Sequence, residues 1–122
     1  MSKYFSKKEI SCHCGCGQSI ENSKLMDIAE FIRQVINKPM NVHCVNRCPA
    51  HNKEVGGVSD SAHTKGEAMD FHVVGMEITA LHDFMKNLWN DGTITDLGLY
   101  DWGCHIGIRQ DKKYFWDNRK VK

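Results

Sequence analysis

The chain has 122 residues, with 16 basic and 15 acidic side chains and a formal net charge of +1. This length suits a single domain over residues 1–122, and we expect a cysteine-rich segment, residues 1–21, to pack on its one hydrophobic core. The near balance of charge excludes a nucleic acid as the expected partner, and no apolar run is long enough to span a membrane.

The N-terminal residues have no apolar run of signal-peptide length, so we expect synthesis in the cytoplasm without a signal peptide. Phe5 to Ile10 is predicted to be a short ordered segment. A helix should then begin at Asn22 or Ser23 and end before Pro39, because apolar residues recur at helical spacing. These residues are Leu25, Ile28, Ala29, Ile32, Val35 and Ile36.

The residues after this helix alternate as in a half-buried strand, from Met40 to Asn46. Pro49 to Val55 can form a short helix that begins at a proline. A second strand is predicted from Ala68 to Val74, and its Ala68, Asp70 and His72 share one face.

The second clear helix is predicted from about Ile78 to Asn90, with His82 on its exposed side. Three strands should follow, Leu97 to Tyr100, Cys104 to Arg109 and an edge strand at Lys113 to Trp116. Helices near the start, followed by strands with one further helix between them, predict an α+β domain with a mostly antiparallel sheet flanked by helices.

Six cysteines are many for a chain of this size that is made in the cytoplasm. Cys12, Cys14 and Cys16 cluster near the start, with only one residue between neighbouring thiols, which is closer than the usual spacing of structural zinc knuckles. A second, structural metal, disulfides from this cluster to Cys44 or Cys48, and buried reduced thiols all remain open.

A histidine and a carboxylate in the stretch Ser61 to Asp70 can reach one metal ion. His63 and Asp70 are separated by Gly66, which lets the backbone turn sharply between them. A catalytic zinc takes three protein ligands and keeps a fourth position for water, so a third ligand must come from elsewhere. The best candidate is His105, because it lies on a predicted strand, which holds a side chain rigidly.

Several segments in chain order resemble one known family. The stretch Ser61 to Asp70 is similar to the Ser-x-His-x-x-Gly-x-Ala-x-Asp motif of the zinc D-alanyl-D-alanine carboxypeptidases, which share their fold with the hedgehog signalling domain. The matching segments on either side are Arg47 to Asn52, Val55 to Gly57, Gly98 to Tyr100, and His105 with Ile106.

The resemblance implies a hedgehog/DD-peptidase-like fold and one catalytic zinc ion held by His63, Asp70 and His105. Zinc in such an open site lowers the pKa of its bound water to about 7 and polarises the scissile carbonyl. The implied function is a metallopeptidase that hydrolyses peptidoglycan stem peptides next to D-amino acids, as a D,D-carboxypeptidase or an L-alanyl-D-glutamate endopeptidase. A short single-domain chain of this kind fits a phage or prophage endolysin, monomeric and acting at the cell wall after release or delivery.

The resemblance also implies that Arg47 is a catalytic or substrate-binding residue, because a guanidinium pairs with a carboxylate through two hydrogen bonds. A surface ion pair with Asp60 or Glu67 is the structural alternative. Ser61 resembles a serine that hydrogen-bonds near the site, although a plain loop serine fits as well.

The general base is where the sequence departs from the family. Dipeptidase and endopeptidase members have a glutamate three residues before the last ligand, and Trp102 stands there; some carboxypeptidases have a histidine five residues before it, and Tyr100 stands there. Asp101 is the candidate base if its turn bulges, and Tyr100 could instead bind substrate by donating a hydrogen bond to the oxyanion.

Two questions stay open from the sequence. His43 and His72 lie on strands near the expected site, where they either orient other groups or have a purely structural role. The absence of the glutamate also leaves a second hypothesis, a non-catalytic zinc-binding domain that binds a wall peptide or a protein partner.

Overall fold

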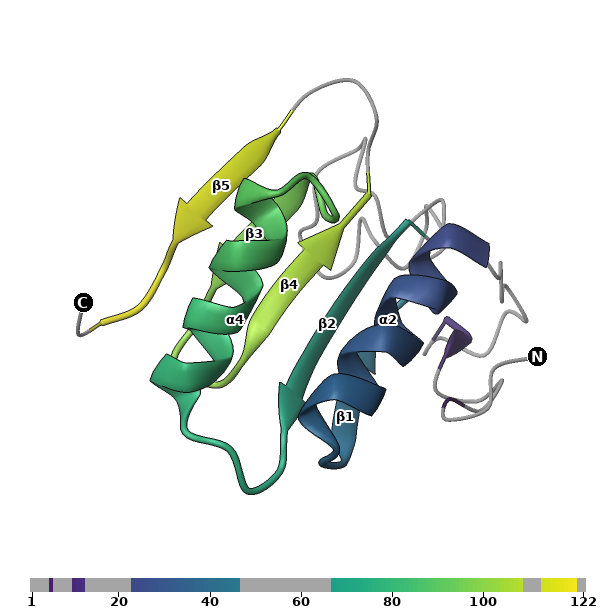
Figure 1. Ribbon diagram of the computed structural model, residues 1–122, viewed down its shortest axis with the longest axis horizontal. Coiled ribbons are helices and arrows are strands. Elements are labelled where there is room, and N and C mark those ends of the chain that lie inside the picture. The colour runs from purple at the N-terminus through teal and green to yellow at the C-terminus, as the bar shows by residue number, and fades with distance from the viewer. Residues whose placement is uncertain (1–4, 6–9, 13–22, 47–66, 109–112, 121–122) are drawn as a thin grey trace.

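The computed structural model describes residues 5, 10–12, 23–46, 67–108 and 113–120. Within them, two helices and five strands follow one another as α2 (Ser23–Ile36), β1 (Met40–Cys44), β2 (Ala68–Val73), α4 (Ile78–Asn90), β3 (Asp96–Leu99), β4 (Cys104–Gly107) and β5 (Tyr114–Asp117). The strands form one sheet in the order β1-β2-β4-β3-β5 (Figure 1). The expected α+β class with a mostly antiparallel sheet is confirmed.

Three of the four strand pairings are antiparallel, and β5 joins the edge of the sheet parallel to β3. β1 pairs with β2 through a register shift between Val42 and Cys44, so the strand carries a β-bulge near its end. Such bulges are over-represented beside active sites, where they redirect a side chain.

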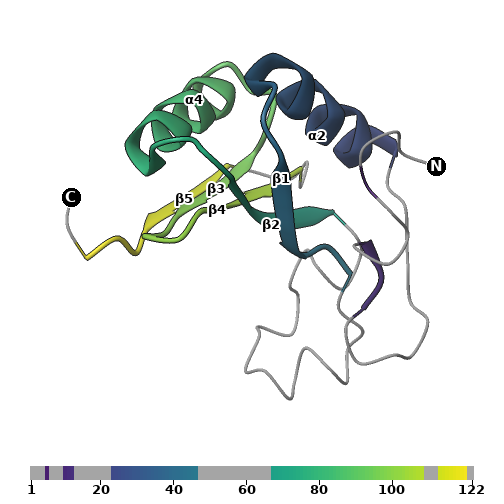
Figure 2. The same ribbon diagram turned by 90° about the horizontal axis from the view of Figure 1, so that it is seen from below.

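Both helices cover the same face of the sheet (Figure 2). That face is apolar because Met69, Phe71 and Val73 alternate along β2 with the more polar Asp70 and His72. Its core is completed by buried residues of the helices and the other strands, among them Leu25, Ala29, Ile32, Leu81, Met85, Leu97, Leu99, Cys104 and Ile106. Asp70 and His72 of β2 therefore lie on the opposite face.

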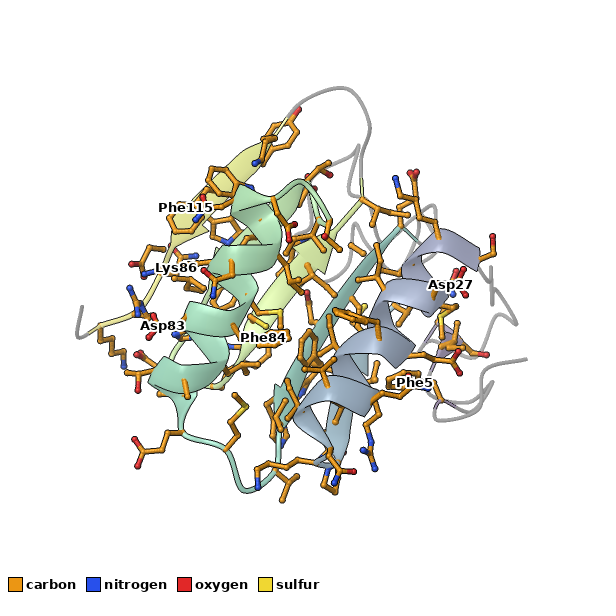
Figure 3. The ribbon with its side chains drawn as sticks, viewed as in Figure 1. Phe5, Asp27, Asp83, Phe84, Lys86 and Phe115 are labelled. Carbon is orange, nitrogen blue, oxygen red and sulfur yellow. The ribbon has the colours of Figure 1, made fainter. Side chains whose placement is uncertain are left out.

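Two details of the helices differ from the prediction. Val35 is 53% exposed and Phe31 is 48% exposed, so the apolar stripe of α2 ends at Ile32 and the partly buried Ile36. His82 was expected on the outer side of α4 and is instead fully buried. Figure 3 shows the outer side of α4 occupied by Asp83 and Lys86, while Phe84 points toward α2.

Each helix ends at a specific backbone conformation. Asn37 adopts the left-handed conformation, with φ of 55°, and its amide donates to the carbonyl of Arg33. This is an αL cap, so α2 ends before Pro39 is reached. After α4, the Asp91 carboxylate accepts hydrogen bonds from both the amide and the hydroxyl of Thr93, and Gly92 takes a positive φ.

Candidate functional site

One row of residues crosses the whole sheet on the face opposite the helices. The pairing places Cys44, Asp70, His105, Gly98 and Trp116 directly opposite one another on β1, β2, β4, β3 and β5. Paired residues of neighbouring strands share a face, and their Cβ atoms lie about 4.5–5.5 Å apart in antiparallel pairs. Two residues 35 positions apart in sequence, Asp70 and His105, are therefore held side by side by the two central strands.

Asp70 and His105 are joined at their polar ends. The Nδ1 atom of His105 lies 2.7 Å from Oδ1 of Asp70, and the two side chains are 10% and 19% exposed, in that order. Strand backbone on both sides fixes where each side chain starts, so the pair is placed by rigid elements. The pair is accessible enough for a small ion or substrate group to reach it.

The chemistry of this pair fits a zinc ion. A neutral imidazole nitrogen and a carboxylate oxygen are two of the ligand types that zinc prefers. Zinc bonds of about 2.1 Å in a tetrahedral arrangement separate two ligand atoms by about 3.4 Å. The Asp70 and His105 atoms would need to part by less than 1 Å relative to their present 2.7 Å to reach that separation. Within residues 5, 10–12, 23–46, 67–108 and 113–120, no group of three or more His, Cys, Asp or Glu side chains could hold a metal.

The third expected ligand, His63, lies outside the described residues, and so do Arg47 and Ser61. They stay predictions. Of the expected metal ligands, the structure brings together Asp70 and His105, the two that come from strands.

Trp116 covers the other side of His105. Its ring centroid lies 4.9 Å from that of His105, and its Nε1 donates a hydrogen bond of 2.7 Å to the hydroxyl of Tyr100. This position requires a glycine beneath it, because a Cβ at Gly98 would come within 2.4 Å of the Trp116 ring. Gly98 and Tyr100 of the Gly-x-Tyr segment therefore both serve to hold Trp116 beside His105.

Tyr100 has a perturbed hydroxyl. Burial raises the pKa of Tyr100 above its usual value, the charge of Asp70 acts in the same direction, and hydrogen bonds from Trp116 and Asn118 oppose them. Tyr100 is thus a neutral hydroxyl at neutral pH, which can donate a hydrogen bond.

A continuous run of ring contacts extends from Tyr100 to the β1 edge of the sheet. Trp102 stacks on Tyr100 at 5.1 Å and 15°, and its ring also contacts that of His43 at 4.9 Å. The Nε2 atom of His43 in turn lies 2.7 Å from Nδ1 of His72, which is two residues from Asp70. We call His72, His43, Trp102, Tyr100 and Trp116 the ring cluster.

The turn between Tyr100 and Gly103, which carries Trp102, is braced from behind. Buried His82 on α4 places its Nε2 3.0 Å from the carbonyl oxygen of Gly103. A Cβ on Gly103 would come within 2.2 Å of the Phe71 carbonyl oxygen, so only glycine fits at this crossing. The turn is therefore fixed to both α4 and β2.

The segment after β5 also holds this turn. Asp101, the expected base, accepts hydrogen bonds of 3.2 Å at both carboxylate oxygens from the backbone amide of Lys120. Arg119 forms a bidentate pair with Asp117 at 2.9 and 2.7 Å, which raises the pKa of Arg119 further above its usual value. The carboxylate of Asp101 thus faces the C-terminal segment, whereas Tyr100 and Trp102 belong to the ring cluster.

The structure describes three of the six cysteines, Cys12, Cys44 and Cys104, and all three are thiols. No disulfide joins any two of these three, and Cys14, Cys16 and Cys48 lie outside the described residues. Burial raises the pKa of the Cys104 thiol well above its usual value, and the charge of Asp70 acts in the same direction. The Cys104 thiol is therefore neutral and packs in the core.

Sequence reasoning missed Trp116 as a site residue and the mutual pairing of His43 with His72. Trp116 belongs to a short edge strand whose partner and direction carry no local signal, and the parallel pairing with β3 is what brings it over Gly98. His43 lies on the His72 face because Asn41, two residues before it, pairs with His72, and that register between β1 and β2 has no local signal in the sequence.

In the part of the chain that the structure describes, no helix is long and apolar enough to cross a membrane. Among curated proteins, none matches the chain. The sequence model of the family described as Peptidase M15 matches residues 3–108, which include Asp70, His105 and the ring cluster except Trp116. On this match over most of its length, the chain belongs to the peptidase M15 family.

Proposed function

We propose that this protein is a zinc metallopeptidase that hydrolyses peptidoglycan stem peptides at a bond next to a D-amino acid. The observation that carries the proposal is the convergence of Asp70 Oδ1 and His105 Nδ1, 2.7 Å apart, in a chain of the peptidase M15 family. With His63 they make the three-ligand set of an open zinc site.

When bound, zinc in such a site lowers the pKa of a water molecule to about 7 and polarises a carbonyl oxygen. Residues of this chain supply the other interactions with the substrate. Tyr100 offers a neutral hydroxyl on the same face of the sheet, suited to donating a hydrogen bond to the oxygen on which negative charge develops. Arg47 pairs with the carboxylate of the substrate, a task for which a planar guanidinium is well suited.

Two bond specificities fit this chemistry, removal of a terminal D-alanine and cleavage of an L-alanyl-D-glutamyl bond. We further propose that the protein acts as an endolysin of a phage or prophage, as a monomer made in the cytoplasm that reaches the wall after release or delivery. The family membership supports this role.

Mass spectrometry of purified muropeptides after incubation with the zinc-loaded protein tests the proposal. We expect loss of a terminal alanine, or release of fragments cut after L-alanine, and no product with His63→Ala. No product from any stem peptide, with one zinc ion still bound per wild-type chain, contradicts the peptidase and supports a binding domain instead.

A further inference from the structure

Hydrolysis of an amide needs a group that takes a proton from water and returns it to the leaving nitrogen. The position where related peptidases have a glutamate is Trp102 in this chain, which has no basic group. The neighbouring Asp101 turns both carboxylate oxygens to the Lys120 amide. Trp102 therefore supplies no proton acceptor, and the Asp101 carboxylate is engaged by the C-terminal segment.

His43 on β1 offers another side chain at this place. Asn41 pairs with His72, and residues two apart on a strand share a face, so His43 lies on the same face as Asn41, His72 and Asp70. The His43 imidazole bonds to His72, and His43 is exposed. The register shift after Val42 sets Cys44 opposite Asp70, so the exposed imidazole of His43 lies next to the row that contains Asp70 and His105.

The His43 ring also lies against Trp102 itself, with ring centroids 4.9 Å apart at 61°. Trp102 is held from its other side by stacking on Tyr100. Trp102, at the position of the glutamate, is therefore in contact with the His43 imidazole of the edge strand β1. An imidazole, whose pKa is ordinarily about 6.5, can both accept and release a proton near neutral pH.

The hydrogen bond between His43 and His72 determines which ring nitrogen of His43 can accept the proton. When Nε2 of His43 donates its hydrogen to Nδ1 of His72, 2.7 Å away, Nδ1 of His43 is the nitrogen that accepts a proton. His72 Nε2 lies 3.4 Å from Nδ2 of Asn41, and the nitrogen of that amide suits one tautomer of His72 whereas its oxygen suits the other. The bond to His72 orients the His43 ring.

We propose that His43 is a catalytic residue of this protein, the general base and then general acid of peptide hydrolysis, in place of the glutamate. This inference rests on the proposed peptidase function. The imidazole takes one proton as the water oxygen bonds to the carbonyl carbon. It returns that proton to the amide nitrogen as the carbon–nitrogen bond breaks, so one water is consumed, a carboxyl group and an amine are released, and His43 ends neutral.

Two variants distinguish a role of His43 in proton transfer from a purely structural role. His43→Gln keeps an amide nitrogen that can bond to His72 but cannot carry a proton, and His43→Ala leaves space for a small base. Steady-state kinetics on the muropeptide that wild type cleaves should show kcat lower by about 100-fold or more in both variants, since a general base contributes about 10² to 10⁴. KM should stay within about threefold, and each variant should bind one zinc ion.

Added imidazole provides the readout that a structural role of His43 would not change. We expect it to raise kcat of His43→Ala at least tenfold and to leave His43→Gln unchanged, because the amide fills the space. The inference is wrong, and the peptidase function stands, if the folded and zinc-loaded His43→Gln variant keeps kcat within about threefold of wild type. The same holds if added imidazole has no effect on His43→Ala. An inactive wild type overturns both.

Discussion

Gly98 shows how a single residue shapes the site. A methyl group there would meet the indole of Trp116 at 2.4 Å, and this indole contacts His105 and donates to Tyr100. The ring cannot move away from Gly98 without leaving those partners. The glycine is therefore a requirement of the site and not of the β3 backbone.

We predict that Gly98→Ala displaces Trp116 and lowers the free energy of unfolding by about 1–3 kcal/mol, the usual cost of overpacking. Urea denaturation and near-ultraviolet circular dichroism measure the two effects. Adding Trp116→Ala should recover part of the loss, because it removes the atoms that the new methyl group meets. A Gly98→Ala protein with wild-type stability and an unchanged aromatic spectrum would show that Trp116 does not lie over Gly98.

Buried His82 gives a second prediction at this scale. Replacing it with leucine removes one of the two hydrogen bonds to the Gly103 carbonyl, which keeps the bond from the Tyr100 amide, and one such bond contributes about 0.5–1.5 kcal/mol. Because the same bond holds the turn that carries Trp102, the substitution should also lower peptidase activity. Chemical denaturation and muropeptide cleavage test both effects. Equal stability of His82→Leu and wild type would contradict the bond.

At the scale of elements, the end of α2 depends on one left-handed residue. Asn37 has φ of 55°, where a side chain with a Cβ is disfavoured and glycine is not. We expect Asn37→Gly to be neutral or stabilising and Asn37→Ala to destabilise by about 1 kcal/mol. Thermal denaturation of the matched pair measures the difference. Equal melting temperatures would mean that the helix continues through Asn37.

The end of α4 predicts a pH dependence. Hydrogen bonds from the Thr93 hydroxyl and amide lower the pKa of Asp91 below its usual value, with a smaller contribution from Lys113. A lowered pKa in the folded state means that this stabilisation is present above the unfolded value, about 3.9, and is lost as the pH falls through the folded value. Asp91→Ala should therefore lower the melting temperature most near pH 6 and least near pH 2. A difference that is constant across this range would contradict the prediction.

The elements were largely predictable because their signals are local. The spacing of apolar residues predicted both helices, and alternation along Ala68 to Val73 placed Asp70 and His72 on the polar face. The bulge in β1, the parallel pairing of β5 and the burial of His82 were not predictable. Each depends on a partner distant in sequence, respectively β2, β3 and the Gly103 carbonyl.

At the scale of the whole molecule, the fold brings motifs that are separate in the sequence together at one site. Two adjacent antiparallel strands bring Asp70 opposite His105, and both helices cover the other face of the sheet. Among the described residues, β1, the 100–103 turn and β5 contribute side chains beside this pair or next to it. The residue types and family pattern predicted the ligands in sequence. The surroundings that orient them, the ring cluster, come from four separate segments and required the three-dimensional structure.

Zinc content of the purified protein and matched variants tests the central claim most directly, because it depends on the ligands and not on finding the right substrate. Native mass spectrometry should count one zinc ion on each wild-type chain and none on Asp70→Ala or His105→Ala. His72→Gln, changed on the same face of the same strand as Asp70, should keep its zinc. Full zinc occupancy in folded Asp70→Ala and His105→Ala would contradict the account, since the metal would then be held elsewhere.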